Sequence, residues 1–149
     1  MLKYDMIVSS RFNLFKHTVT HRSKRSETNT MKTILIIDDE AFVHEYLGKV
    51  ISRLGYQVET AASATAGLNA LKNSQIDLVI ADVYLPDSPM PYQWLGQLAE
   101  TAAGRPIVLI SGAPTDELVQ NAAKCGISTF LSKPFELAFI RNVLTDTLN

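Results

Sequence analysis

The sequence predicts a doubly wound α/β domain, in which a parallel sheet carries helices on both of its faces. Three observations predict this fold. Short apolar runs recur along the chain, helical apolar patterns fill the intervals between them, and most of the runs are continuous rather than alternating. Continuous apolar runs are typical of strands covered on both faces. Strands and helices that alternate in this way, joined by right-handed crossovers, give a (βα)5 parallel sheet.

We expect strands at five short segments of the chain. Three are continuous apolar runs, at 34–37, 78–81 and 107–110, and a shorter run lies at 130–131. The segment 56–61 instead alternates between apolar and polar residues. This alternation predicts a half-exposed strand at an edge of the sheet.

The intervals between these segments show the apolar spacing of helices. Val43, Leu47 and Leu54 lie on one helix face, and Gly55 follows as a C-terminal stop. Ser63 is the expected N-cap of the second helix. The later helices are predicted by three apolar sets: Leu95, Leu98 and Ala102; Leu118, Ala122 and Cys125; and Leu137, Ile140, Leu144 and Leu148.

The composition excludes several classes of protein. The chain has 149 residues, of which 46% are hydrophobic and 19% charged, as in one ordinary domain with a proper core. It holds no apolar run of roughly 18 residues, the length that suggests a membrane helix. Its single cysteine, Cys125, cannot form an internal disulfide. We therefore expect a cytoplasmic chain that is not associated with a membrane.

Residues 1–30 differ in charge from the remainder of the chain. They carry six Lys or Arg against two acids, whereas residues 31–149 carry eight bases and thirteen acids. The first segment shows no sustained helical or strand period, so we expect a basic, disordered extension followed by the domain proper. An organelle transit peptide and a basic arm that touches nucleic acid or anionic lipid are the alternatives for this segment.

Polar side chains follow the predicted strands, at the edge of the sheet where ligands bind in open α/β folds. Asp38 and Asp39 follow the first strand, Asp82 the third, Ser111 the fourth and Lys133 the last. Two carboxylates about 4 Å apart repel by about 4 kcal/mol at an effective dielectric near 20. The Lys133 ammonium or a hard divalent cation such as Mg²⁺ would neutralise them. A carboxylate such as Asp82 can then take up a phosphoryl group as a nucleophile.

Residues 31–148 resemble the receiver domain of two-component response regulators. The resemblance rests on four motifs in the family's order, each at the end of a predicted strand. They are ILIIDDE at 34–40, DLVIADVYLPD at 77–87, IVLISGA at 107–113 and FLSKPF at 130–135. The resemblance implies a flavodoxin-like fold with the strand order 2-1-3-4-5.

The resemblance also implies roles for the residues that match the family's motifs. Asp82 matches the phosphoacceptor. Asp38 and Asp39 match the acidic pair that holds Mg²⁺, with Asp39 as the more direct ligand, and the backbone carbonyl of Tyr84 matches the third protein ligand. Ser111 matches the hydroxyl residue that turns toward the phosphoryl group.

Two further roles concern the last strand and the helix after it. Lys133 matches the family's invariant lysine, and its bond to Pro134 is expected to be cis. Phe130 matches the aromatic switch residue, whose ring moves inward as Ser111 shifts. The loop after the fourth strand, and the surface of the fourth helix, fifth strand and fifth helix, would then change shape. In relatives this surface contacts partner proteins and allows a homodimer.

The resemblance implies a stand-alone receiver that takes a phosphoryl group from a phosphohistidine. The donor would be a histidine kinase or a histidine phosphotransfer protein, and the output would be contact with a downstream protein. No output domain follows the last helix, so we expect no direct contact with nucleic acid. We expect no conventional enzyme, although the chain would catalyse its own phosphorylation from small donors and its own dephosphorylation.

The loop after Asp82 departs from the family pattern. Relatives usually carry glycine where this chain has Met90, and three prolines stiffen the loop. One alternative is therefore a phosphorylation-independent interaction module on the same fold. Another is a Mg²⁺ phosphohydrolase with an aspartyl intermediate, but such enzymes want a second acid where Tyr84 stands. For two other residues we expect ordinary roles: a solvated position for His44 and packing for Trp94.

Overall fold

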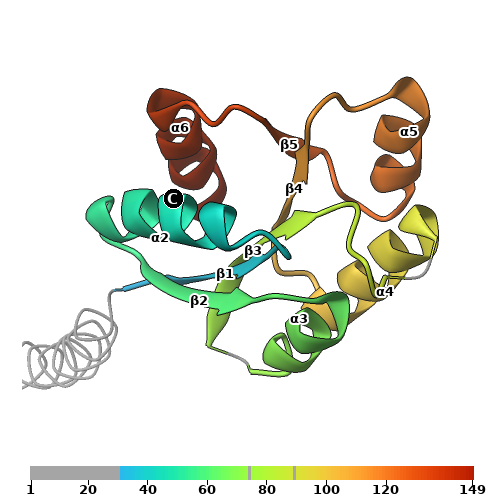
Figure 1. Ribbon diagram of the computed structural model, residues 1–149, viewed down its shortest axis with the longest axis horizontal. Coiled ribbons are helices and arrows are strands. Elements are labelled where there is room, and N and C mark those ends of the chain that lie inside the picture. The colour runs from blue at the N-terminus through green and yellow to red at the C-terminus, as the bar shows by residue number, and fades with distance from the viewer. Residues whose placement is uncertain (1–30, 74, 89) are drawn as a thin grey trace, which may run out of the picture. The chain divides into compact units, whose positions relative to one another are not determined.

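Five parallel strands form one sheet in the order β2-β1-β3-β4-β5 (Figure 1). The computed structural model describes residues 31–149 apart from positions 74 and 89, so the prediction for residues 1–30 lies outside the described residues. The strands are β1 (Thr33–Ile37), β2 (Gln57–Ala61), β3 (Ile76–Asp82), β4 (Ile107–Ser111) and β5 (Thr129–Ser132). The fold class and the strand order predicted from the sequence are confirmed.

Helices cover both faces of the sheet, and they divide the core into two layers. The helices are α2 (Ala41–Arg53), α3 (Ala64–Ala70), α4 (Pro91–Ala102), α5 (Asp116–Lys124) and α6 (Leu137–Leu148). Side chains alternate across each strand. Leu35 and Ile37 therefore join the layer under α3, α4 and α5, whereas Ile34 and Ile36 join the layer under α2 and α6.

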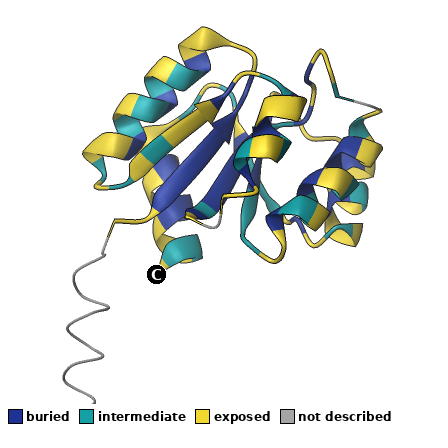
Figure 2. Ribbon diagram, turned by 90° about the horizontal axis from the view of Figure 1, so that it is seen from below, coloured by how far each residue is buried: buried dark blue, intermediate teal, exposed yellow. Residues whose placement is uncertain are grey.

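The central strands are buried and the edge strand β2 is not (Figure 2). Every residue of β1 is buried, as the continuous apolar run predicts. Gln57, Glu59 and Thr60 of β2 are exposed, which confirms the prediction of an edge strand. None of the described helices combines the length and the apolar character that crossing a membrane requires.

The predicted helix ends are present. The Ser63 Oγ accepts a hydrogen bond from the Ala66 N–H at 3.1 Å, so Ser63 caps α3. Gly55 follows α2 with φ 97°, in the left-handed region that favours glycine. Helix α4 begins at Pro91, one turn earlier than its apolar spacing indicates.

One arginine joins the ends of two helices at the edge of the sheet opposite the predicted site. The Arg105 guanidinium donates hydrogen bonds to backbone carbonyls at the C-terminal ends of α3 and α4 and at the start of β3. The acceptors belong to Leu71, Asn73, Ile76 and Thr101, and the Arg105 Nε adds a bond to Ala102. Carbonyls at the C-terminal end of a helix lack intrahelical donors, so Arg105 supplies donors where α3 and α4 end.

Candidate functional site

All five polar side chains that the sequence places at strand ends lie at one edge of the sheet. Asp38 and Asp39 follow β1, Asp82 ends β3, Ser111 ends β4 and Lys133 follows β5. In a parallel sheet the carboxyl ends of all strands meet at the same edge. The strand order then sets Asp82 between the acidic pair on one side and Ser111 on the other.

Three carboxylates form an acidic cluster at this edge. Asp38, Asp39 and Asp82 each offer an oxygen within 4.8 Å of the others. Asp38 is fully buried, and its Oδ1 accepts a hydrogen bond from the Glu40 N–H at 2.8 Å. Its Oδ2 is buried without a hydrogen-bond partner among the described residues. A buried carboxylate oxygen without a donor is costly, so this cluster suits a hard divalent cation that takes oxygen ligands.

The two carboxylate oxygens of Asp82 have different neighbours. Its Oδ1 accepts a hydrogen bond from the Tyr84 N–H at 2.9 Å, and its Oδ2 lies 4.0 Å from the Lys133 Nζ. Burial raises the pKa of Asp82 to about 6, and the nearby Asp38 carboxylate adds to the rise. Burial also raises the pKa of Asp38.

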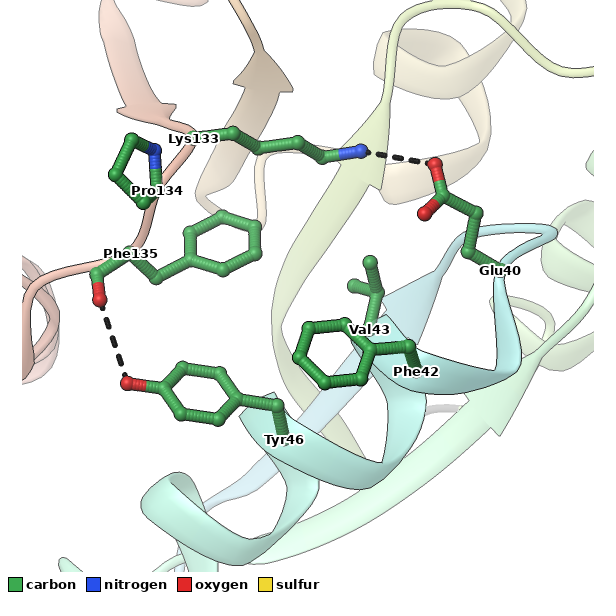
Figure 3. A pocket seen from close by; sticks show the side chains of 7 residues that line it. All are labelled: Glu40, Phe42, Val43, Tyr46, Lys133, Pro134 and Phe135. Carbon is green, nitrogen blue, oxygen red and sulfur yellow. Dashed lines mark hydrogen bonds and ion pairs between the residues drawn. The ribbon is translucent and has the colours of Figure 1, made fainter.

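Lys133 is held between two acidic groups. Its Nζ lies 3.2 Å from the Glu40 Oε1, as the dashed line in Figure 3 marks, and 4.0 Å from Asp82. Burial acts to lower the pKa of Lys133, but the hydrogen bond to Glu40 and the charges of Asp38 and Asp82 outweigh it, so the pKa is raised. The Lys133–Pro134 bond is cis, as predicted.

Sequence reasoning gave Glu40 no role of its own. The sequence feature that could have indicated a role is its position directly after the Asp38–Asp39 pair. In the structure its backbone N–H donates a hydrogen bond to Asp38, and its side chain pairs with Lys133. A residue that binds one site group with its backbone and another with its side chain links the ends of β1 and β5.

Ser111 and Phe130 lie on the neighbouring strands β4 and β5. Ser111 is buried, and Ser132 is its partner in the β4–β5 register. Phe130 pairs with Leu109, is partly buried and packs against the core layer under α3, α4 and α5. A movement of either side chain stays a prediction.

The loop between β3 and α4 is tied to α3. The Asp87 carboxylate accepts hydrogen bonds from the N–H groups of Ala64 and Thr65, at 2.8 and 3.0 Å. These bonds lower the pKa of Asp87. Leu85 is buried and Tyr84 exposes its ring, so the loop is anchored in spite of the missing glycine at Met90.

The structure confirms the ordinary role predicted for Trp94 and overturns the one predicted for His44. Trp94 is fully buried, as expected, but its Nε1–H also donates a hydrogen bond to the backbone carbonyl of Asp82 at 3.0 Å. The prediction of a solvated His44 is wrong. Its ring is partly buried, and its Nε2 is shielded from solvent without a partner among the described residues. The apolar spacing of the helix does not reveal this shielding.

An apolar cavity of about 360 Å³ lies beside Lys133, between α2 and the segment after β5 (Figure 3). Phe42, Tyr46 and Phe135 form its aromatic wall. The Tyr46 ring stacks against both other rings, with centroids 6.1 and 6.3 Å away. The Tyr46 hydroxyl donates to the Phe135 carbonyl at 3.3 Å, which fixes the segment after the cis peptide to α2.

Comparison with known proteins assigns this arrangement to a class. The model of the response regulator receiver domain matches residues 34–145. The chain is 28% identical over 121 residues to the sensor histidine kinase RcsC of Salmonella typhimurium, which covers 81% of this chain and 13% of that protein. It is 27% identical over 115 residues to the transcriptional regulatory protein GlrR of Escherichia coli, covering 77% of this chain and 26% of that one.

A solved structure shows the same fold. The CheY-like response regulator receiver domain protein of Methanospirillum hungatei aligns with a TM-score of 0.73 and 24% identity, over 80% of this chain and 94% of that one. The chain therefore belongs to the response regulator receiver domain family of two-component signal transduction. Receiver domains are phosphoacceptor signalling domains that act with histidine kinases and downstream effectors. The chain spans about an eighth of the length of the kinase that it matches.

Proposed function

We propose that this chain accepts a phosphoryl group on Asp82 from a phosphohistidine, in a reaction that depends on Mg²⁺. The observation that carries the proposal is the environment of Asp82. One carboxylate oxygen accepts a hydrogen bond from the Tyr84 N–H, and the other lies 4.0 Å from the Lys133 ammonium. The neighbouring Asp38 has a buried oxygen without a hydrogen-bond partner among the described residues. A structural ion pair does not need a second buried carboxylate beside it.

Asp38, Asp39, Asp82 and the backbone carbonyl of Tyr84 would hold the ion. Each of the three carboxylates places an oxygen within 4.8 Å of the others, and the Asp38 Oδ2 lacks a donor among the described residues, which fits a hard cation with oxygen ligands. When bound, Mg²⁺ supplies positive charge that balances the oxygens of a transferring phosphoryl group.

The phosphoryl transfer forms one covalent bond to the protein, at the Asp82 carboxylate. An Asp82 oxygen attacks the phosphorus, an O–P bond forms, the N–P bond of the donor histidine breaks, and the imidazole leaves with the bonding electrons. A pKa of about 6 leaves most of the Asp82 carboxyl ionised at neutral pH, as a nucleophile requires. Lys133 lies close enough to balance the negative charge of the phosphoryl oxygens.

Phosphorylation would be read out through Ser111 and Phe130. The phosphoryl group adds about two negative charges and strong hydrogen-bond acceptors. The Ser111 hydroxyl donates to one of them, and Phe130 moves into the space that Ser111 leaves. Because Phe130 belongs to β5, the movement changes the surface of α5, β5 and α6, where Leu137, Phe139 and Val119 are exposed. We place the downstream partner, or a second copy of the chain, on this surface.

The experiment uses acetyl phosphate as a small phosphodonor, with and without Mg²⁺, and intact mass spectrometry as the readout. We expect one added phosphoryl group that requires Mg²⁺ and is absent in Asp82→Asn. The matched control is Asp77→Asn, which removes a carboxylate from the opposite end of the same strand and should keep the adduct. An adduct that persists in Asp82→Asn would contradict the assignment of the acceptor.

A wild-type chain without an adduct is next tested with beryllofluoride, which mimics an aspartyl phosphate. Binding would assign a receiver that selects its donor, and the search would turn to histidine kinases and phosphotransfer proteins. Failure to bind would refute the proposed function and favour the phosphorylation-independent module.

A further inference from the structure

We propose that Trp94 is a positioning residue for Asp82, and that it acts through the peptide group that follows Asp82. The inference rests on the proposed function only where it predicts the rate of phosphorylation. The structural part concerns the acidic cluster itself, whatever reaction takes place there.

The peptide between Asp82 and Val83 is bound at both of its polar atoms. Its carbonyl oxygen accepts a hydrogen bond from the Trp94 Nε1–H at 3.0 Å, and its N–H, that of Val83, donates to the Ile110 carbonyl of β4 at 3.4 Å. This is the point where β3 leaves the sheet, so the indole supplies the donor for the last carbonyl of the strand. The indole belongs to α4, and the peptide therefore joins α4 to β4.

The orientation of this peptide determines how the Asp82 side chain is held. The next N–H along the chain, that of Tyr84, donates to the Asp82 Oδ1 at 2.9 Å. A rotation of the Asp82–Val83 peptide would turn the backbone at Tyr84 and lengthen this bond. It would also turn the Tyr84 carbonyl, which is proposed to bind the ion. Trp94 thus fixes two groups of the site without touching either of them.

The indole is held in the core, and it has a single N–H donor for this bond. Trp94 is fully buried, with 0% of its surface accessible to solvent, and it packs in the core layer that also contains Val83 and Leu98. Indole N–H is only a donor, and buried tryptophans usually find an acceptor for it. If the N–H were removed, the Asp82 carbonyl would have to turn toward another donor or stay unpaired.

The test compares Trp94→Phe with Leu98→Ala. Both changes remove the same number of side-chain heavy atoms from one face of α4, but only the first removes the donor to Asp82. We expect Trp94→Phe to weaken Mg²⁺ binding, measured by calorimetry, and to slow phosphorylation by acetyl phosphate, each by about tenfold, as is typical when the residue that orients a ligand group is lost. Leu98→Ala should lower stability and leave both quantities within about twofold of the wild type, because packing alone does not orient the peptide.

Equal Mg²⁺ affinities and rates in the two variants would overturn the proposal, because Trp94 would then act only by packing. A wild type that binds Mg²⁺ but forms no adduct would defeat the proposed function, and the Mg²⁺ affinities would still decide the role of Trp94. A wild type that does neither would refute both.

A second measurement needs no substitution. Trp94 is the sole tryptophan of the sequence, so its indole N–H gives a single resonance in a ¹⁵N-labelled sample. We expect this N–H to exchange slowly with solvent and its resonance to shift when Mg²⁺ or beryllofluoride is added. A resonance that exchanges fast, or that neither addition moves, would overturn the proposal even if Trp94→Phe failed to fold.

Discussion

Asn in place of Asp82 removes a buried negative charge and keeps the shape of the side chain, so we expect the variant to be more stable than the wild type in the absence of metal. Burial raises the pKa of Asp82 from its ordinary value of 3.8 to about 6. Folding therefore shifts the equilibrium of this carboxyl toward its neutral form, compared with the unfolded chain. As the pH rises through this window, the wild type ionises Asp82 at a cost and loses stability.

The size of the effect follows from the change in pKa. Each tenfold change in the ionisation constant is worth about 1.4 kcal/mol, so the charged carboxylate costs up to about 3 kcal/mol at pH 8. At pH 5 the cost is about half as large, because the folded protein then keeps most of its Asp82 protonated. The Asn side chain keeps an acceptor for the Tyr84 N–H, so this hydrogen bond at 2.9 Å is not sacrificed.

The assay is urea unfolding of both proteins in EDTA at pH 5 and pH 8. Asp82→Asn should raise the free energy of unfolding at pH 8, and by less at pH 5. Asp77→Ala is the control of opposite sign, because alanine offers no side-chain acceptor. The Asp77 carboxylate accepts a hydrogen bond from the Thr33 N–H at 2.8 Å, and its loss should lower stability. A variant at Asp82 that is no more stable than the wild type at pH 8, or whose gain is larger at pH 5, would refute the reasoning.

Three further predictions concern residues outside the acidic cluster. Glu40→Gln should lower the pKa of Asp82, because Lys133 is then free to pair with Asp82, while stability changes by less than about 1 kcal/mol. The pKa is measured by ¹³C NMR of the carboxyl in EDTA, and a pKa that stays or rises would contradict the competition of Glu40 and Asp82 for Lys133. Arg105→Lys should lower the free energy of unfolding in urea by about 2 kcal/mol, because one ammonium cannot donate hydrogen bonds to all the carbonyls that the guanidinium reaches. An unchanged unfolding midpoint would contradict this capping role. Gly67→Ala should lower the melting temperature, because the new Cβ would lie 2.5 Å from the Ile37 side chain. The overpacking costs about 1–3 kcal/mol, which exceeds the helix-propensity gain of about 1 kcal/mol. Adding Ile37→Val to the same chain should recover part of the loss, and no recovery would mean that this contact is not the cause.

The sequence by itself determined the layered fold and the edge at which the site lies. The apolar runs of β1, β3 and β4 need cover on both faces, and the alternation in β2 allows one face to meet water. Parallel strands bring their carboxyl ends to one edge, so residues that directly follow strands meet there whatever the details of packing. For this reason the sequence alone predicts that Asp38, Asp82 and Lys133 lie together.

Only the tertiary structure decided which groups hold these side chains in place. Glu40 reaches Lys133 across 93 positions of the chain, and Asp87 reaches the start of α3 across 23. The bond from Trp94 to the Asp82 carbonyl depends on where α4 settles against β3. Each contact joins elements through the conformation of a loop and the rotation of a helix, and neither is encoded in a local apolar period. The pattern therefore specifies where strands and helices form, whereas side-chain packing between distant segments fixes the orientation of each group in the site.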